Sequence, residues 1–338
     1  MSTGTRKTSK KTSAGSPVFQ LAAPMPAETL EAGNIKIMAY EHASDMGLAS
    51  ALNIASEQCR LAEQKGSVSL MLMAAPSAEP FYSAYTRLVE NSLRLRDAVR
   101  KTHFFQFDDY RLPLLSAASF RHLLCKRFFF PIAEYYDVDK VHLFQSDAKD
   151  INQACRQYGS LIMAHGPDLQ LKGTGENGHW GFHEPGIPLD TAPRFQRVAL
   201  SKENVAQQMR DHPRLFKTPG SVPTEAFTAN VALFMRTRVL IEDNVPQASK
   251  AFALLASHGS SKVDAASPSS ALKKHRNGIV RTTLAAAWAL LEYRRKGVVT
   301  PSMLDRMAAS TAPGGFDRIE QIKADMRKVL EQMNVKCS

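Results

Sequence analysis

Cysteine is scarce in this chain. The four cysteines, at positions 59, 125, 155 and 337 of 338 residues, lie far apart. No two of them form a Cys-x-x-Cys pair, so the sequence indicates neither a disulfide framework nor a cysteine-based zinc site. Long apolar runs are also missing, and none approaches the roughly 20 residues that cross a bilayer. These absences predict a soluble cytoplasmic protein with no membrane partner.

Acidic residues are absent from the start of the chain, where the first is Glu28. The segment before it is rich in serine and threonine and contributes Arg6, Lys7, Lys10 and Lys11 to a formal net charge of +11. This composition cannot bury enough apolar surface to become ordered, and it lacks the apolar core of a secretory signal. We predict a disordered basic leader over residues 1–30. No nucleic-acid motif accompanies the charge, which favours a solvated tail over a nucleic-acid partner.

Internal repeats are absent too, and beyond the leader apolar segments alternate with helical patterns. Residues 67–73 form a near-continuous apolar run, which is typical of a parallel strand buried on both faces. The patterns predict further strands over residues 35–39, 104–107, 141–144 and 168–172, and helices over residues 43–65, 80–100, 120–134 and 152–163. Strands that alternate with helices at this spacing predict βαβ units and a mostly parallel sheet.

The last segment, residues 283–338, is predicted to be a helical extension. One helix is expected over residues 283–293, and another begins at Thr300-Pro301. After a break at residues 313–315, a capping-box-like Asp317 and Glu320 precede an apolar stripe at helical spacing. The first interpretation of this stripe is packing on the chain's own domain. The second is the seam of a homo-oligomer.

A glycine-rich segment, residues 173–186, follows the strand predicted over residues 168–172 and reads GTGENGHWGFHEPG. Its glycines and its proline exclude a continuous helix or strand. It nevertheless carries the side chains that acid–base chemistry uses, which are Glu176, Asn177, His179, His183 and Glu184. A glycine-rich turn at the carboxyl end of a strand lets the backbone approach a ligand closely. We interpret this segment as half of an active site.

Other interpretations of the same segment stay open. Gly173, Gly175 and Gly178 satisfy the dinucleotide pattern G-x-G-x-x-G, which requires a helix to open at its last glycine. A metal site would use His179 and His183, whose spacing of four suits a helix. The glycines and Pro185 that follow disfavour a helix in both cases. A structural turn with satisfied polar groups is the third interpretation.

A pair of acids, Asp108 and Asp109, follows the strand predicted over residues 104–107. Two adjacent acids at the end of a strand usually form a solvated turn or a helix cap. On the residues alone, that interpretation is favoured over a catalytic one.

These two places together resemble a known family. The glycine-rich segment resembles the signature of the glucosamine-6-phosphate deaminase/isomerase family, which is related to the 6-phosphogluconolactonases. The matching positions are Gly173, Gly175, Asn177, Gly178, His179, Phe182, Glu184, Pro185 and Gly186. Trp180 and His183 depart from that signature, which has a smaller apolar residue and an asparagine there. Asp108-Asp109-Tyr110 is similar to the Asp-Glu-Tyr that the family carries after a strand.

The resemblance implies a fold and a reaction. The fold would be a three-layer α/β/α, Rossmann-like domain over residues 31–282. The reaction would convert a hexosamine 6-phosphate to a ketose with release of ammonia. His179 would open the sugar ring, oriented by Glu184 and Asn177, and Asp108 would move a proton from C2 to C1. The resemblance implies no metal and no organic cofactor, because the carbonyl and the amine supply the activation.

The resemblance also implies substrate-binding residues, which are Asp109, Gly175, Gly178, Ser77, Ala78, Arg194 and Lys250. Ser77 and Ala78 lie in residues 76–80, where the family has a Thr-Gly loop for phosphate and this chain has Glu79. If the ionised Glu79 faced the pocket, the repulsion between unit charges about 4 Å apart would be roughly 4 kcal/mol at an effective dielectric constant near 20. The alternative is that Glu79 points to solvent and caps its own helix.

Two other functions remain open beside the deaminase. The spacing from Asp108 to Pro113 is one residue tighter than in deaminases and closer to the 6-phosphogluconolactonases, which suggests a lactone hydrolase. The altered loop over residues 76–80 suggests a sugar-phosphate-binding protein without turnover. In each case the expected partner is a small-molecule sugar phosphate.

Overall fold

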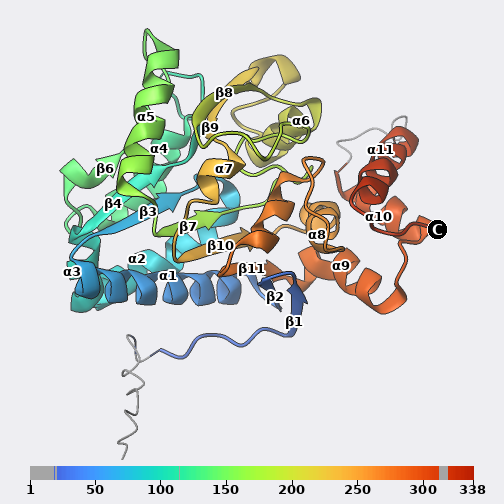
Figure 1. The fold of residues 1–338 in the computed structure, drawn as a ribbon, viewed down its shortest axis with the longest axis horizontal. Coiled ribbons are helices and arrows are strands. Elements are labelled where there is room, and N and C mark those ends of the chain that lie inside the picture. Colours follow the sequence, from blue (N-terminus) through green and yellow to red (C-terminus); the bar gives the residue numbers. More distant parts are fainter. Residues whose placement is uncertain (1–18, 20, 114, 312–318) are drawn as a thin grey trace, which may run out of the picture.

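The computed structural model describes residues 19, 21–113, 115–311 and 319–338, and it is built around one large sheet (Figure 1). The sheet has eight strands in the order β1-β2-β11-β10-β7-β3-β4-β6. Their bounds are Glu28–Ala32 (β1), Ile35–Tyr40 (β2), Gly278–Thr283 (β11), Leu240–Val245 (β10), Leu169–Lys172 (β7), Val68–Leu72 (β3), Thr102–Gln106 (β4) and Val141–His142 (β6). All neighbouring strands are parallel except β1 and β2. The predicted mostly parallel sheet is confirmed.

Helices cover both faces of this sheet, which gives the three-layer architecture that the resemblance implied. In Figure 1 the layer below contains α1 (Ala43–Lys65), α2 (Glu79–Asn91) and α3 (Leu93–Arg100). The layer above contains α4 (Phe120–Leu124), α5 (Ile151–His165), α6 (Lys202–Asp211) and α7 (Val231–Phe234). Every residue of β3 and of β10 is buried. That double coverage explains why residues 67–73 read as a continuous apolar run.

A second, three-stranded antiparallel sheet was not predicted from the sequence. It consists of β5 (Asp108–Tyr110), β9 (Glu225–Ala229) and β8 (Phe195–Ala199), in that order. Asp108 pairs with Thr228 and Asp109 pairs with Phe227. The two acids therefore lie on a strand rather than in the solvated turn that their sequence alone favoured. Because side chains alternate along a strand, the two carboxylates point to opposite faces.

Two predicted helices were too long. The helix predicted over residues 80–100 is broken at Ser92, which has an extended backbone and caps α3 by accepting a hydrogen bond from the N–H of Leu95. The helix predicted over residues 120–134 is α-helical only as far as Leu124. A π-helical turn (Cys125–Phe129) and a 3₁₀ turn (Phe130–Ile132) follow it. Pro131 lies in that 3₁₀ turn, where its missing N–H and fixed φ disfavour continuation of an α-helix.

The two ends of the chain differ in part from the prediction. β1 begins at Glu28, inside the segment that we predicted as a disordered leader, because residues 28–32 pair with β2. Residues 1–18 lie outside the described residues. At the other end follow α8 (Ala251–His258), α9 (Leu284–Lys296), α10 (Pro301–Thr311) and α11 (Ile319–Gln332). Met326 and Leu330 of α11 are buried in the main hydrophobic core. The predicted cap at Asp317 falls outside the described residues.

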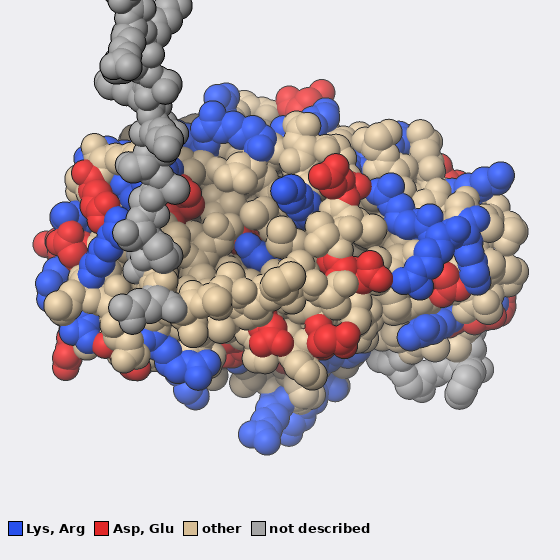
Figure 2. Space-filling view, turned by 90° about the horizontal axis from the view of Figure 1, so that it is seen from below, with Lys and Arg blue, Asp and Glu red and all other residues tan. Residues whose placement is uncertain are grey.

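Charge is mixed on the face that Figure 2 shows, where Lys and Arg side chains are interspersed with Asp and Glu. A continuous basic surface is the usual footprint of nucleic-acid binding, and this face does not present one. Among the described residues, no helix is both long enough and apolar enough to cross a membrane.

Candidate active site

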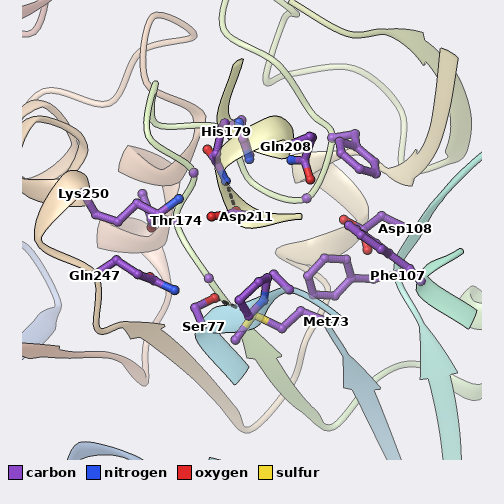
Figure 3. A pocket seen from close by; sticks show the side chains of 18 residues that line it. Met73, Ser77, Phe107, Asp108, Thr174, His179, Gln208, Asp211, Gln247 and Lys250 are labelled. Carbon is purple, nitrogen blue, oxygen red and sulfur yellow. Dashed lines mark hydrogen bonds between the residues drawn. The ribbon is translucent and has the colours of Figure 1, made fainter. Parts of the chain in front are cut away.

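A pocket lies where the carboxyl ends of the central strands meet (Figure 3). Ser77 comes from the turn after β3, Gly173 and Gly175 follow β7, and Lys250 follows β10. Asp108 enters from β5 of the small sheet. The pocket holds about 500 Å³ of space, its open mouth included. Parallel α/β sheets bind ligands at this edge, because the loops there converge.

The glycine-rich segment crosses the floor of this pocket without forming a helix. Glycine at position 175 leaves room for the His179 ring, because a Cβ there would overlap its Nε2 atom unless the ring moved. Gly178 adopts φ +87°, and a Cβ on it would meet the Ser267 hydroxyl at 2.4 Å. Since no helix opens at Gly178, the dinucleotide interpretation fails. The loop instead brings the imidazole of His179 close to the backbone.

Three of the predicted catalytic residues form one hydrogen-bonded chain. The Nδ1 atom of His179 lies 2.8 Å from the Asn177 Oδ1 atom, and the Asn177 amide donates to Glu184 Oε2 at 3.0 Å. Asn204 donates to the other carboxylate oxygen of Glu184. Because an amide oxygen only accepts hydrogen bonds, the proton of the imidazole is on Nδ1 and the lone pair is on Nε2.

Burial keeps the His179 imidazole neutral. Its pKa is lowered to about 3, first because the ring is desolvated and then because the cations of Lys250 and Lys172 repel a proton. The side chain lines the pocket. A neutral imidazole with an available Nε2 can accept a proton from a bound hydroxyl and return it to a nearby oxygen.

Asp108 is a buried carboxylic acid in the wall of the pocket. Only 4% of the residue is exposed, and its Oδ1 atom has no hydrogen-bond partner among the described residues. Burial raises the pKa of Asp108 well above its usual value, and the charge of Asp109 raises it further. A desolvated carboxyl with a free oxygen that faces a pocket has the properties of a general base.

Asp109 has a different environment and is not among the residues that line the pocket, so the structure does not support its predicted role in binding substrate. Its carboxylate accepts hydrogen bonds from Gln106, the Ser119 hydroxyl and the backbone N–H of Phe120. It therefore fixes the start of α4. The strand alternation that turns Asp108 toward the pocket turns Asp109 toward this helix.

Some of the other predicted binding residues line the pocket and some do not. Ser77, Gly175 and Lys250 line the pocket. Gly178, Ala78 and Arg194 are not among its lining residues, so the structure gives them no direct contact with a ligand there. Arg194 is exposed, and its Nε atom donates to the side chain of Gln196 at 2.7 Å. Ala78 is buried in the turn before α2.

The structure also shows the surroundings of Glu79 and His183, for which the sequence left alternatives open. Glu79 forms an ion pair with Arg127 at 2.6 Å and is half exposed outside the pocket, so it does not repel a bound anion directly. His183 accepts a hydrogen bond at Nδ1 from the N–H of Val231, and its Nε2 lies 3.1 Å from the carbonyl oxygen of Ile187. Both of its ring nitrogens are therefore occupied, and the His179–His183 metal interpretation fails.

The sequence analysis missed the contribution of α6. Gln207, Gln208 and Asp211 of this helix line the pocket, as does Gln247 after β10. Arg210 lies beside them and forms an ion pair with Glu176, but its Nε and Nη1 atoms are buried without a partner among the described residues. A signal was present in the sequence. Polar residues at positions 204, 207, 208 and 211 fall on one face of a helix, where an apolar stripe would otherwise pack on the sheet.

Lys250 supplies a positive charge to the pocket. Burial lowers its pKa to about 8, while the charge of Asp211 raises it and that of Arg210 lowers it. Figure 3 shows Lys250 and Gln247 on one side of the hollow and Asp108 with Phe107 on the other. The pocket thus has a cationic end and an acid–base end, separated by the space for a ligand.

The fold and this site define an α/β protein with an acid–base pocket at the carboxyl edge of its sheet, and comparison with known proteins identifies the family. A glucosamine-6-phosphate deaminase from Shouchella clausii is 30% identical over 220 residues, which cover 64% of this chain and 83% of that protein. The chain belongs to the glucosamine-6-phosphate deaminase family. No family model matches the chain.

Other relatives agree with this assignment. A glucosamine-6-phosphate deaminase from Rhodopirellula baltica is 37% identical over 107 residues, which cover 31% of this chain and 40% of that protein. The solved structure of a monomeric glucosamine-6-phosphate deaminase matches with a TM-score of 0.64 and 25% identity, over 75% of this chain and 99% of that one. The 6-phosphogluconolactonase of Trypanosoma brucei shares the fold, with a TM-score of 0.58 and 17% identity over 75% of this chain and 97% of that one.

Proposed function

We propose that this chain is an aldose–ketose isomerase that deaminates a hexosamine 6-phosphate. The observation that carries the proposal is that Asp108 and His179 line one pocket, with Lys250 on the side opposite Asp108. Such an arrangement suits a sugar that has its reacting carbons at one end and an anionic group at the other. The relatives named glucosamine-6-phosphate deaminase support the same reaction.

In the first step, His179 opens the sugar ring. Its Nε2 atom takes the proton of the anomeric hydroxyl as the bond between C1 and the ring oxygen breaks, and the proton passes to the ring oxygen. The protein's contribution is orientation, because Asn177 and Glu184 hold the ring in the tautomer that leaves Nε2 free.

In the second step, Asp108 removes the proton from C2, which the neighbouring C1 carbonyl makes acidic, and an enolamine forms. The same carboxyl then delivers a proton to C1. Water adds to the resulting imine carbon at C2, and ammonia leaves to give the ketose. Burial raises the pKa of Asp108 well above its usual value, which makes the carboxylate a stronger base toward the C2 proton.

The cationic end would hold the phosphate. Lys250 lines the pocket, and Arg210 lies close enough for its charge to lower the pKa of Lys250. Arg210 is not a lining residue, so it adds positive charge to this end without a direct contact, and Arg194 is no longer proposed for it. Asp211 and Glu176 bring negative charge to the same region, so the phosphate competes with carboxylates for these cations. Because of this competition, we expect the phosphate to bind more weakly than it would in a pocket without acids.

The pH dependence of kcat/KM should show the role of Lys250. Since the pKa of Lys250 is about 8, the side chain is charged below that pH and neutral above it. We expect kcat/KM to fall above pH 8, through a rise in KM, in the wild type. Lys250→Arg keeps the charge at all these pH values and should remove the fall, even if its activity is lower. An alkaline fall of unchanged position in Lys250→Arg would contradict the assignment.

The reaction itself is tested by a panel of 6-phosphorylated hexosamines and hexoses, their unphosphorylated counterparts and 6-phosphogluconolactone. We expect ammonia and ketose from a hexosamine 6-phosphate, with deuterium at C1 when the reaction runs in deuterated water. Acid release from the lactone without deuterium exchange would replace the proposal by lactone hydrolysis. Binding without any product would replace it by a sugar-phosphate-binding role.

A further inference from the structure

Three histidines lie together outside the active site. They are His103 of β4, His142 of β6 and His165 at the end of α5. One ring nitrogen from each lies within 4.8 Å of the other two. Among the described residues, this is the only group of three or more His, Cys, Asp or Glu side chains with that geometry.

The sheet register explains why these residues meet. His142 pairs with Phe105, so the two side chains project from the same face of the sheet. His103 is two residues before Phe105 on β4 and projects from that face as well. His165 reaches the pair from α5, and its ring lies 4.2 Å from that of His103 between centroids. His103 is near the amino end of β4, whereas the active-site pocket lies at the carboxyl edge.

One pair of ring nitrogens lies close to the spacing that a tetrahedral metal ion requires. The Nδ1 atom of His103 and the Nε2 atom of His142 are 3.0 Å apart. Two imidazole ligands at about 2.0–2.1 Å from a tetrahedral zinc ion have nitrogens about 3.3 Å apart. All three histidines are partly exposed, so solvent could supply a fourth ligand.

The surroundings hold the three residues in place. The Tyr158 hydroxyl donates to the backbone oxygen of His142 at 2.8 Å, and Arg238 donates to the backbone oxygen of His165 at 3.3 Å. The nearby Lys140 is paired with Asp137 at 3.0 Å, which reduces its repulsion of a cation.

We propose that His103, His142 and His165 form a three-histidine site for a divalent transition-metal ion, with Zn²⁺ as the ion that its ligand set and geometry fit. Imidazole ligands select Zn²⁺ and its neighbours over Mg²⁺ and Ca²⁺, which prefer oxygen. The bound ion joins β4, the edge strand β6 and the end of α5. Its role is structural, because the site is separate from the pocket that holds Asp108 and His179.

The test is metal binding by the full chain, followed in two ways. Competition with a chromophoric chelator should show one equivalent of Zn²⁺, and Co²⁺ should give the strong visible absorption of a tetrahedral site. His103→Gln and His142→Gln should each weaken binding by at least about tenfold. His42→Gln is the matched control, because His42 is exposed and lies outside the group; it should bind as the wild type does.

A measurement on the wild type covers the case in which a glutamine variant does not fold. X-ray absorption at the zinc edge should show three imidazole ligands, and bound Zn²⁺ should raise the thermal midpoint. Binding that is equally strong in His103→Gln, His142→Gln and the wild type would overturn the proposal. So would the absence of one-equivalent binding in the wild type, or a spectrum of an ion coordinated by oxygen alone.

Discussion

Asp108→Asn is expected to lower kcat by about 10²–10⁴-fold, the usual contribution of a general base. An amide cannot take the C2 proton, so the exchange of deuterium into C1 should disappear together with turnover. Binding of the substrate should remain measurable, because Asp108 lies opposite the cationic end. Steady-state kinetics and isotope exchange on the same variant provide the measurement. Full activity would exclude Asp108 as the base.

The same variant should not lose stability at neutral pH. The pKa of Asp108 is higher in the folded state than in the unfolded chain, so ionisation costs stability as the pH rises through the folded-state pKa. The asparagine side chain removes this cost. The thermal midpoint of Asp108→Asn should therefore equal or exceed that of the wild type at pH 8, and the difference should shrink in acid.

Asp109→Asn is the matched control, because it makes the same chemical change at the adjacent residue. The Asp109 carboxylate accepts hydrogen bonds from Gln106, Ser119 and the backbone of α4. An amide would replace one acceptor by a donor and cost about 1–3 kcal/mol of stability. The two neighbouring substitutions should thus have different effects on stability, with a loss only in Asp109→Asn. Loss of stability in Asp108→Asn and none in Asp109→Asn would contradict the assigned environments.

Lys172→Met is expected to destabilise the fold by about 3–5 kcal/mol, because it leaves a buried charge without its partner. The Lys172 ammonium donates to Asp243 Oδ2 at 2.6 Å and to the Thr174 hydroxyl at 3.0 Å. Both side chains of the ion pair are 0% exposed. The pair joins β7 to β10 directly beneath the glycine-rich loop. Chemical denaturation, compared by midpoint and slope, measures the effect.

Two further variants test the origin of this loss. Lys172→Met combined with Asp243→Leu removes both charges and should recover part of the stability, since no charge is then left unpaired. Lys101→Met breaks the ion pair with Asp97, whose side chains are 38% and 57% exposed, and should cost less than about 1 kcal/mol. The double variant could instead be less stable than Lys172→Met, by as much as a second substitution in the core costs. In that case the unpaired buried charge would not be the cause of the stability loss in Lys172→Met.

Much of the architecture was predictable from local patterns. The helix predicted over residues 43–65 is α1, with Gly66 in the left-handed conformation as its C-cap. The apolar run over residues 67–73 contains β3. These predictions succeeded because burial on one or both faces leaves its own period in the sequence. The small antiparallel sheet was missed, because β5 and β9 pair across more than a hundred residues and carry no hairpin signal between them.

The candidate site, too, was predictable only in its local parts. The glycine-rich segment offered five acid–base side chains, and the family resemblance selected Asn177, His179 and Glu184 among them, which form one hydrogen-bonded chain in the structure. Tertiary structure decided which way the side chains of the acids and arginines point. Asp108 faces the pocket and Asp109 does not because of the pairing of β5 with β9.

What the sequence alone determined is therefore the α/β class, the family and the acid–base loop, since these depend on the alternation of strands and helices along the chain and on two short motifs. Tertiary structure decided that Glu79 pairs with Arg127, that Arg210 rather than Arg194 lies near Lys250, and that three separate histidines meet. The physical reason is that a side chain's charge partner and solvent exposure depend on elements brought together only by folding.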